Sequence, residues 1–129
     1  MNKILVEVSV GELLDKISIL EIKKDKIQDP EKLRFISEEH AILKDQLEQN
    51  VKSDKKLNDL FKSLKEINAR LWVIEDDKRV CEKNKNFGET FIKLSRNVHF
   101  LNDDRAKIKL EMNIHSGSKI KEIKEYVKY

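Results

Sequence analysis

The chain has 129 residues, of which 39% are hydrophobic and 40% charged, with three glycines and one proline. This balance is typical of a single helical domain, here expected to cover residues 1–129, and it argues against a β-sandwich or a disordered chain. The net charge is +3, with 27 basic and 24 acidic residues interspersed, so we do not expect a nucleic-acid partner.

A short extended segment opens the chain. Hydrophobic residues alternate along residues 2–8, a pattern typical of an extended segment or an edge strand. One face carries Ile4, Val6 and Val8, and the other carries Lys3, Leu5 and Glu7.

The first helix is expected to begin after Ser9, because Ser9 and Glu12 match a capping box. Ile19 and Ile22 point away from its main apolar face. A helix with two apolar faces is either central in the fold or lies at a dimer interface. The main face contains one charged residue, Glu21, among Val10, Leu13, Leu14, Ile17 and Leu20.

Two longer helices should follow. Asp29 and Pro30 are typical of a helix start, and the second helix is expected to end near Asn50. Ser53 or Asp54 should cap the third helix. The second helix has an inner face of Leu33, Ile36, His40, Leu43 and Leu47, and the third has one of Leu57, Leu60, Phe61, Leu64, Ile67, Leu71 and Ile74. The face of the third helix then becomes polar, with Asn68, Glu75, Arg79 and Glu82.

The fourth helix should begin at a capping-box-like sequence from Asn86 to Glu89 and end at Gly117. Its apolar stripe contains Arg105. The other members of the stripe are Phe87, Phe91, Leu94, Val98, Leu101, Ile108 and Met112. Ser118 could then cap a short last helix that carries Ile120, Ile123 and Val127.

These elements predict an all-α fold, an antiparallel four-helix bundle with a short extended N-terminal segment and a short C-terminal helix. Short polar loops make sequential helices neighbours, which favours the antiparallel arrangement. Apolar residues outside the main stripes suggest additional apolar surface, from which we expect a homodimer. They are Ile19, Ile22, Ile92, Phe100, Leu110 and Ile114.

A charged centre is expected inside the bundle. Arg105, Glu21 and Glu75 each fall within the apolar arc of a helix, and charged side chains are almost never buried unless they are paired. Only five of the 27 basic residues are arginine, and the planar arginine fork suits carboxylates. The candidate ligand-binding residues are Glu21, Glu75, Arg79, Asn102 and Arg105.

No metal or cofactor is expected. The Glu-x-x-His pairs of a di-iron bundle are absent, and there is no glycine-rich phosphate loop or nucleophile elbow. Glu12 and Asp15 have the one-turn spacing of a magnesium-binding carboxylate pair, but we expect them at an exposed helix start.

The sequence also favours the cytoplasm. Cys81 is the single cysteine, so neither an intrachain disulfide nor a multi-cysteine zinc site can form. The apolar run at residues 4–8 is too short for a signal peptide, and no segment approaches the ~20 apolar residues of a membrane span.

Three segments together resemble a group of uncharacterised bacterial and phage proteins of about this length, known only as a domain of unknown function. They read VSVGELLDKISILEIKKDKI, LWVIEDDKRVCE and FIKLSRNVHFLNDDRAKIKLEMNIHSGSKIKE. The resemblance implies a single-domain, mostly helical protein, and it brings no activity, cofactor or substrate.

Two functions follow from these observations, and the sequence leaves open whether the protein is an enzyme. The first is a homo-oligomeric interaction or accessory module in which a buried Arg/Glu network fixes the helices. The alternative is a small enzyme or binding protein for a carboxylate or phosphate, held by Arg79 and Arg105 with Glu21 or Glu75 as acid or base. A cleft at Arg105 would favour the second function, and charges that satisfy one another would favour the first.

Overall fold

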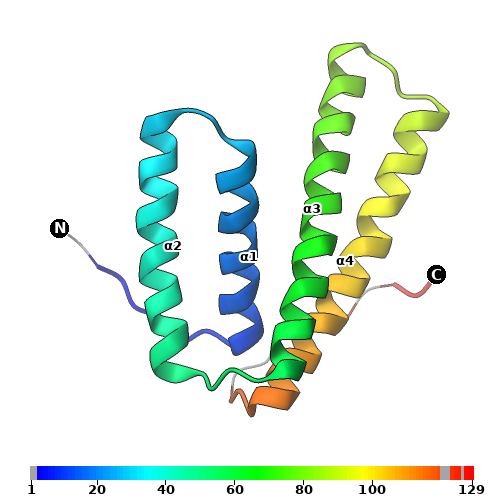
Figure 1. The fold of residues 1–129 in the computed structure, drawn as a ribbon. Helices are drawn as coiled ribbons and strands as arrows, with labels where there is room; N and C mark the ends of the chain where they lie inside the picture. Colours follow the sequence, from blue (N-terminus) through cyan, green and yellow to red (C-terminus); the bar gives the residue numbers. More distant parts are fainter. Residues whose placement is uncertain (1–2, 120–122, 126) are drawn as a thin grey trace.

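The computed structural model describes residues 3–119, 123–125 and 127–129, and within these ranges the chain is all-α, as predicted. Its elements are α1 (Val10–Lys26), α2 (Pro30–Asn50), α3 (Lys55–Lys83) and α4 (Glu89–Ser116). No strand occurs in the described ranges. Two helical hairpins, α1/α2 and α3/α4, stand side by side, and the α3/α4 hairpin extends beyond the end of α1 (Figure 1).

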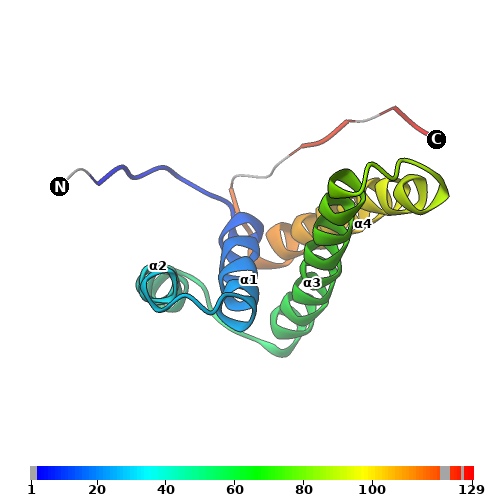
Figure 2. The same ribbon diagram turned by 90° about the horizontal axis from the view of Figure 1, so that it is seen from above.

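Helix α1 is the centre of the arrangement. It packs against α2, α3 and α4, whereas α2 packs against α1 alone among the helices (Figure 2). The two apolar faces of α1 are therefore explained by its central position, and Ile22 is buried within the chain. The predicted inner face of α2 does include its half-buried residues, but no residue of α2 is fully buried.

The helix starts follow the predicted caps in three cases. The Ser9 hydroxyl accepts a hydrogen bond from the Glu12 amide at 3.0 Å. Asp29 caps α2, with Pro30 as the first helical residue. Asp54, rather than Ser53, caps α3. These ends form where expected because each cap depends on residues within one helical turn.

The start of α4 differs from the prediction. The helix begins at Glu89, after Gly88, and the Asn86 side chain accepts from the Gly88 amide at 3.2 Å instead of capping the helix. Phe87 therefore precedes the helix and stays about half exposed. Its ring packs edge-on against Phe91, with 5.5 Å between centroids. The end of α4 is as predicted, because Gly117 adopts the left-handed conformation that suits glycine, with φ 65°.

The predicted short C-terminal helix is not seen. Residues 123–125 and 127–129 are not helical, and Ile120 lies outside the described residues. Tyr129 instead contacts α4. Its ring lies 5.2 Å from that of His99 and 5.4 Å from that of Phe100, and its hydroxyl donates to Asp103. At the other end, residues 3–9 form neither a helix nor a strand.

The hydrophobic core lies where α1, α3 and α4 meet. Leu14, Leu57, Leu64 and Met112 form a cluster of buried side chains there. None of the helices in the described ranges has the length and apolar character needed to cross a membrane.

Helices α1 and α4 approach each other closely at Gly11. The Gly11 amide donates to Asn113 Oδ1 at 2.7 Å, across more than one hundred residues of sequence. A Cβ atom at this position would lie 2.7 Å from the Lys109 carbonyl oxygen, a backbone atom that cannot move aside alone. Glycine is therefore required at this helix crossing.

We predict that Gly11→Ala destabilises the protein by about 1 to 3 kcal/mol, because the methyl group forces α1 away from α4. In an open helix interior the same change would stabilise the protein by about 1 kcal/mol. The sign of the stability change therefore distinguishes a close helix contact from an open position. Urea unfolding followed by circular dichroism measures the change. Lys16→Ala, at an exposed position of α1, is the control. A Gly11→Ala protein as stable as the wild type would show that the two backbones are not in contact.

Candidate functional site

Arg105 of α4 pairs with Asp15 of α1. The Asp15 side chain is only 2% exposed. The guanidinium makes a two-point contact with its carboxylate, in which Nε donates to Oδ1 at 3.1 Å and Nη2 donates to Oδ2. This fork-to-carboxylate geometry is among the stronger polar contacts in proteins, and lysine cannot reproduce it.

Further side chains complete the coordination of Asp15. Asn68 of α3 donates through Nδ2 to Asp15 Oδ1 and to Ser18 Oγ, both at 2.8 Å. The Ser18 hydroxyl in turn donates to the Asp15 carbonyl. Lys109 Nζ lies 3.6 Å from Asp15 Oδ2 and donates to Glu12 Oε2 at 2.8 Å. We call this set the Asp15 network; it consists of Glu12, Asp15, Ser18, Asn68, Arg105 and Lys109.

The charges of the network favour an ionised Asp15. Burial by itself would raise the pKa of this carboxyl group, because it removes water from the charged form. Hydrogen bonds from Arg105 and Asn68, with the charges of Arg105 and Lys109, outweigh burial and lower the pKa below its ordinary value of 3.8. Asp15 is therefore a buried anion whose charge is balanced by the chain itself.

The local sequence explains how the network is positioned. Gly11, Asp15, Ser18 and Ile22 follow one another at helical spacing and form one face of α1. The small Gly11 and Ser18 allow neighbouring helices to approach on both sides of the carboxylate. On α4, Arg105 and Lys109 are one turn apart, so both cations reach the same face of α1.

The five predicted site residues are not brought together. Arg105 is half-buried in the Asp15 network, and Asn102 is half-buried on α4 without belonging to the network. Glu75 and Arg79 are exposed on α3. Glu21 forms a separate cluster, described below, so that neither it nor Glu75 is the partner of Arg105. The ligand-binding role of these residues stays a prediction.

Glu21 connects α1 with α2 and α3. Its carboxylate lies 3.2 Å from His40 Nε2 and accepts from Lys65 Nζ at 3.0 Å. Burial acts to raise the pKa of Glu21, but the hydrogen bonds and charges of Lys65 and His40 lower it below its ordinary value of 4.5. Here too the charge is balanced by neighbouring helices.

Sequence reasoning missed Asp15 and Lys109. The expectation that Asp15 lies at an exposed helix start was wrong, because α4 covers that turn of α1. One signal was present: the spacing of Gly11, Ser18 and Ile22 marks a second buried face of α1, and Asp15 lies within it. Lys109 had no comparable signal among 27 basic residues.

The buried polar atoms of the Asp15 network are hydrogen-bonded. Among the described residues, the only buried side-chain nitrogen or oxygen atom without a hydrogen-bond partner is Ser116 Oγ, which does not belong to the network. In the same part of the chain, no group of three or more His, Cys, Asp or Glu side chains is placed to hold a metal ion. The network is therefore suited to fixing the positions of α1, α3 and α4.

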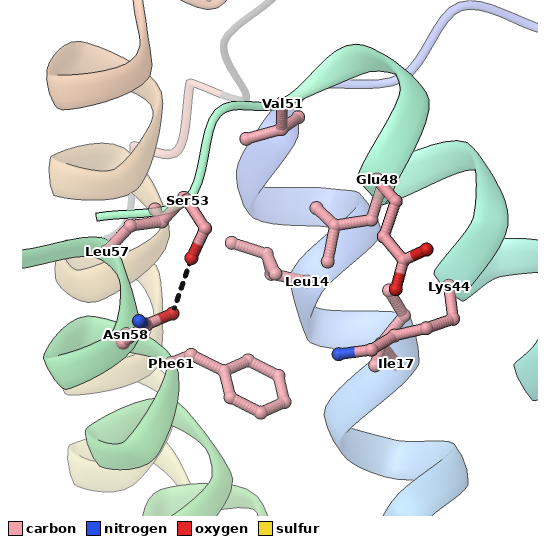
Figure 3. Close-up of a pocket in the computed structure, with 10 residues that line it drawn as sticks. Leu14, Ile17, Lys44, Glu48, Val51, Ser53, Leu57, Asn58 and Phe61 are labelled. Carbon is pink, nitrogen blue, oxygen red and sulfur yellow. Dashed lines mark hydrogen bonds between the residues drawn. The ribbon is translucent and has the colours of Figure 1, made fainter. Parts of the chain in front are cut away.

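An apolar groove lies apart from the network, between α2 and α3 and over α1 (Figure 3). Its volume is about 210 Å³, below the roughly 300 to 1,000 Å³ typical of small-molecule sites. Leu14 and Ile17 contribute from α1, and the Phe61 ring extends into the space between the helices. Ser53 and Asn58 are hydrogen-bonded to each other at 3.1 Å. The groove lies where the backbones of α2 and α3 stay apart while both pack on α1.

Comparison with known proteins assigns the family. Residues 4–128 match a family of unknown function, DUF6165, so the chain belongs to that family. No curated protein and no solved structure matches the chain. The membership agrees with the resemblance found in the sequence and adds no activity to it.

We predict that Arg105→Met lowers the free energy of unfolding by roughly 3 to 5 kcal/mol, because it leaves a buried carboxylate without its main partner. Urea unfolding at neutral pH measures the loss. Arg79→Met makes the same change at an exposed arginine and should cost well under 1 kcal/mol. Equal effects of the two substitutions would contradict a structural role for the Arg105–Asp15 pair.

Low pH should remove the contribution of Asp15 to the free energy of unfolding. The pKa of Asp15 is lowered below its ordinary value of 3.8 in the folded state. The ionised carboxylate therefore makes its full contribution to the free energy of unfolding well above that ordinary value. The contribution is lost as the pH falls through the folded-state pKa. The stability difference between wild type and Asp15→Asn should therefore be constant from about pH 7 to 5 and shrink at lower pH. Unfolding measured at several pH values tests this. The control is Glu75→Gln, which changes an exposed carboxylate and should have nearly the wild-type stability at every pH. If the stability difference between wild type and Asp15→Asn did not change with pH, the expectation would be refuted.

Proposed function

We propose that this member of a family of unknown function is a homo-oligomeric interaction module, in which the Asp15 network fixes the helices and binds no ligand. The observation that carries the proposal is that the buried Asp15 carboxylate is hydrogen-bonded by Asn68 of α3 and Arg105 of α4 and lies 3.6 Å from Lys109 Nζ of α4. The charged centre therefore has a structural role that requires no further molecule.

The energetics of the Arg105–Asp15 pair weigh against the alternative function. An anionic ligand at Arg105 would compete with Asp15 for the guanidinium. Displacing Asp15 would leave a buried carboxylate with fewer partners, at a cost of several kcal/mol. Arg79, the second predicted clamp, is exposed and outside the network.

Exposed apolar side chains support an interaction role. Ile92 and Ile114, which the sequence marks as additional apolar surface, are more than half exposed. Exposed apolar side chains mark association surfaces where they gather in one patch. Further large apolar residues that are at least partly exposed lie in the segment before α1 and on the α3/α4 hairpin; they include Ile4, Leu5, Val6, Val73, Val80 and Leu110.

Two measurements test the proposal. Light scattering at tens of micromolar protein should give at least the mass of a dimer. Melting temperatures in millimolar phosphate or succinate should equal those in sodium chloride of matched ionic strength, because no site binds the anion. A monomer in solution would contradict the oligomer, and a saturable rise in melting temperature with either anion would contradict the structural role of the network.

A further inference from the structure

We propose that residues 3–7 pair with the same segment of a second copy of this chain, in an antiparallel two-stranded ribbon centred on Leu5. This inference rests on the proposed homo-oligomeric function and names the surface through which two copies meet.

The segment leaves the helical body at Val8. The exposed fraction is 86% at Ile4, falls to 44% at Val8, and is 4% at Ser9, the cap of α1. Residues 3–8 run outward from the start of α1, away from the packed helices (Figure 2). Its apolar side chains thus face solvent when the chain is alone.

The backbone of the segment is also without partners. No hydrogen bond between described residues involves residues 3–8, and the described ranges contain no strand on which they could pair. The segment nevertheless has the composition of a strand, with Ile, Val and Leu in alternation. An extended segment with free amide and carbonyl groups is a template for pairing with another chain.

The charges of the segment make it complementary to itself. In an antiparallel pair centred on Leu5, Lys3 of one copy lies opposite Glu7 of the other, and this favourable pair occurs twice. Ile4 then lies opposite Val6. A parallel in-register pair would instead place Lys3 opposite Lys3 and Glu7 opposite Glu7, which is unfavourable. The antiparallel register also has the two-fold symmetry of a closed dimer.

The two faces of such a ribbon have different characters. One face carries the Lys3–Glu7 pairs around the two Leu5 side chains. The other face of the paired residues is apolar, with Ile4 and Val6 from each copy, and Val8 continues this face toward α1. A two-stranded ribbon alone is marginally stable in water, so this apolar face must be covered. Since α1 begins directly after Ser9, we place the apolar face at the junction of the two helical bodies.

Charge exchange tests the register. Lys3→Glu and Glu7→Lys, each alone, put like charges opposite each other at both ends of the ribbon and should weaken dimerisation roughly fivefold or more. An equimolar mixture of the two variants restores opposite charges at both ends, so its affinity should return to about the wild-type value. Sedimentation of the full chain measures these constants. Circular dichroism checks that the helices, which lie outside the segment, are unchanged.

Crosslinking tests the centre of the ribbon. Leu5 lies opposite itself across the two-fold axis, close enough for a disulfide, so Leu5→Cys should form a covalent dimer on mild oxidation. Ile4→Cys lies opposite Val6 and should crosslink much less. The wild type, whose Cys81 is buried, gives the background.

The outcomes separate this inference from the proposed function. A dimer whose affinity is unchanged in both charge variants, or which crosslinks equally at positions 4 and 5, would overturn the ribbon and leave the interaction module standing. A monomer at tens of micromolar would overturn both proposals. Stabilisation by phosphate or succinate would overturn the structural role of the Asp15 network without affecting the ribbon.

Discussion

The fold depends above all on the pairing of buried Asp15 with Arg105. A carboxylate in this position must be neutralised, and its donors come from two other helices, Asn68 on α3 and Arg105 on α4. Sliding α1 by one turn would separate all of these groups at once, whereas apolar contacts alone would tolerate such a shift. The network therefore selects one register for α1 against the α3/α4 hairpin, and Gly11 permits the close approach that this register requires.

The helices could be predicted from the sequence because their signals are local. Caps such as Ser9, Asp29 and Asp54 act within one turn, and helical periodicity identifies the main apolar face of each helix. The incorrect predictions concern segments whose local sequence is compatible with two structures. Asn86 bonds within its own turn instead of capping α4, and the tail that was expected to form a helix ends with Tyr129 against α4.

The site was only partly predictable, since periodicity shows which side chains point inward but not what they meet. Arg105 was correctly placed inside, yet its partner is 90 residues away and on a face of α1 that carries little apolar area. The polar stretch of α3 with Glu75 and Arg79 has another cause. Both side chains are exposed, and the α3/α4 hairpin extends beyond the end of α1, so that α1 covers only part of its length (Figure 1).

Helix α2 is held less firmly than the other three helices, so stability differs along the chain. Helix α2 contains no fully buried residue, although its Leu47 packs against the core cluster around Leu14, so less buried surface holds α2 than holds the other helices. It is thus the weakest cooperative folding unit, whose amide hydrogens would exchange with solvent well before those of α1. Detachment of α2 would also separate His40 from Glu21 and widen the groove over Leu14 and Ile17.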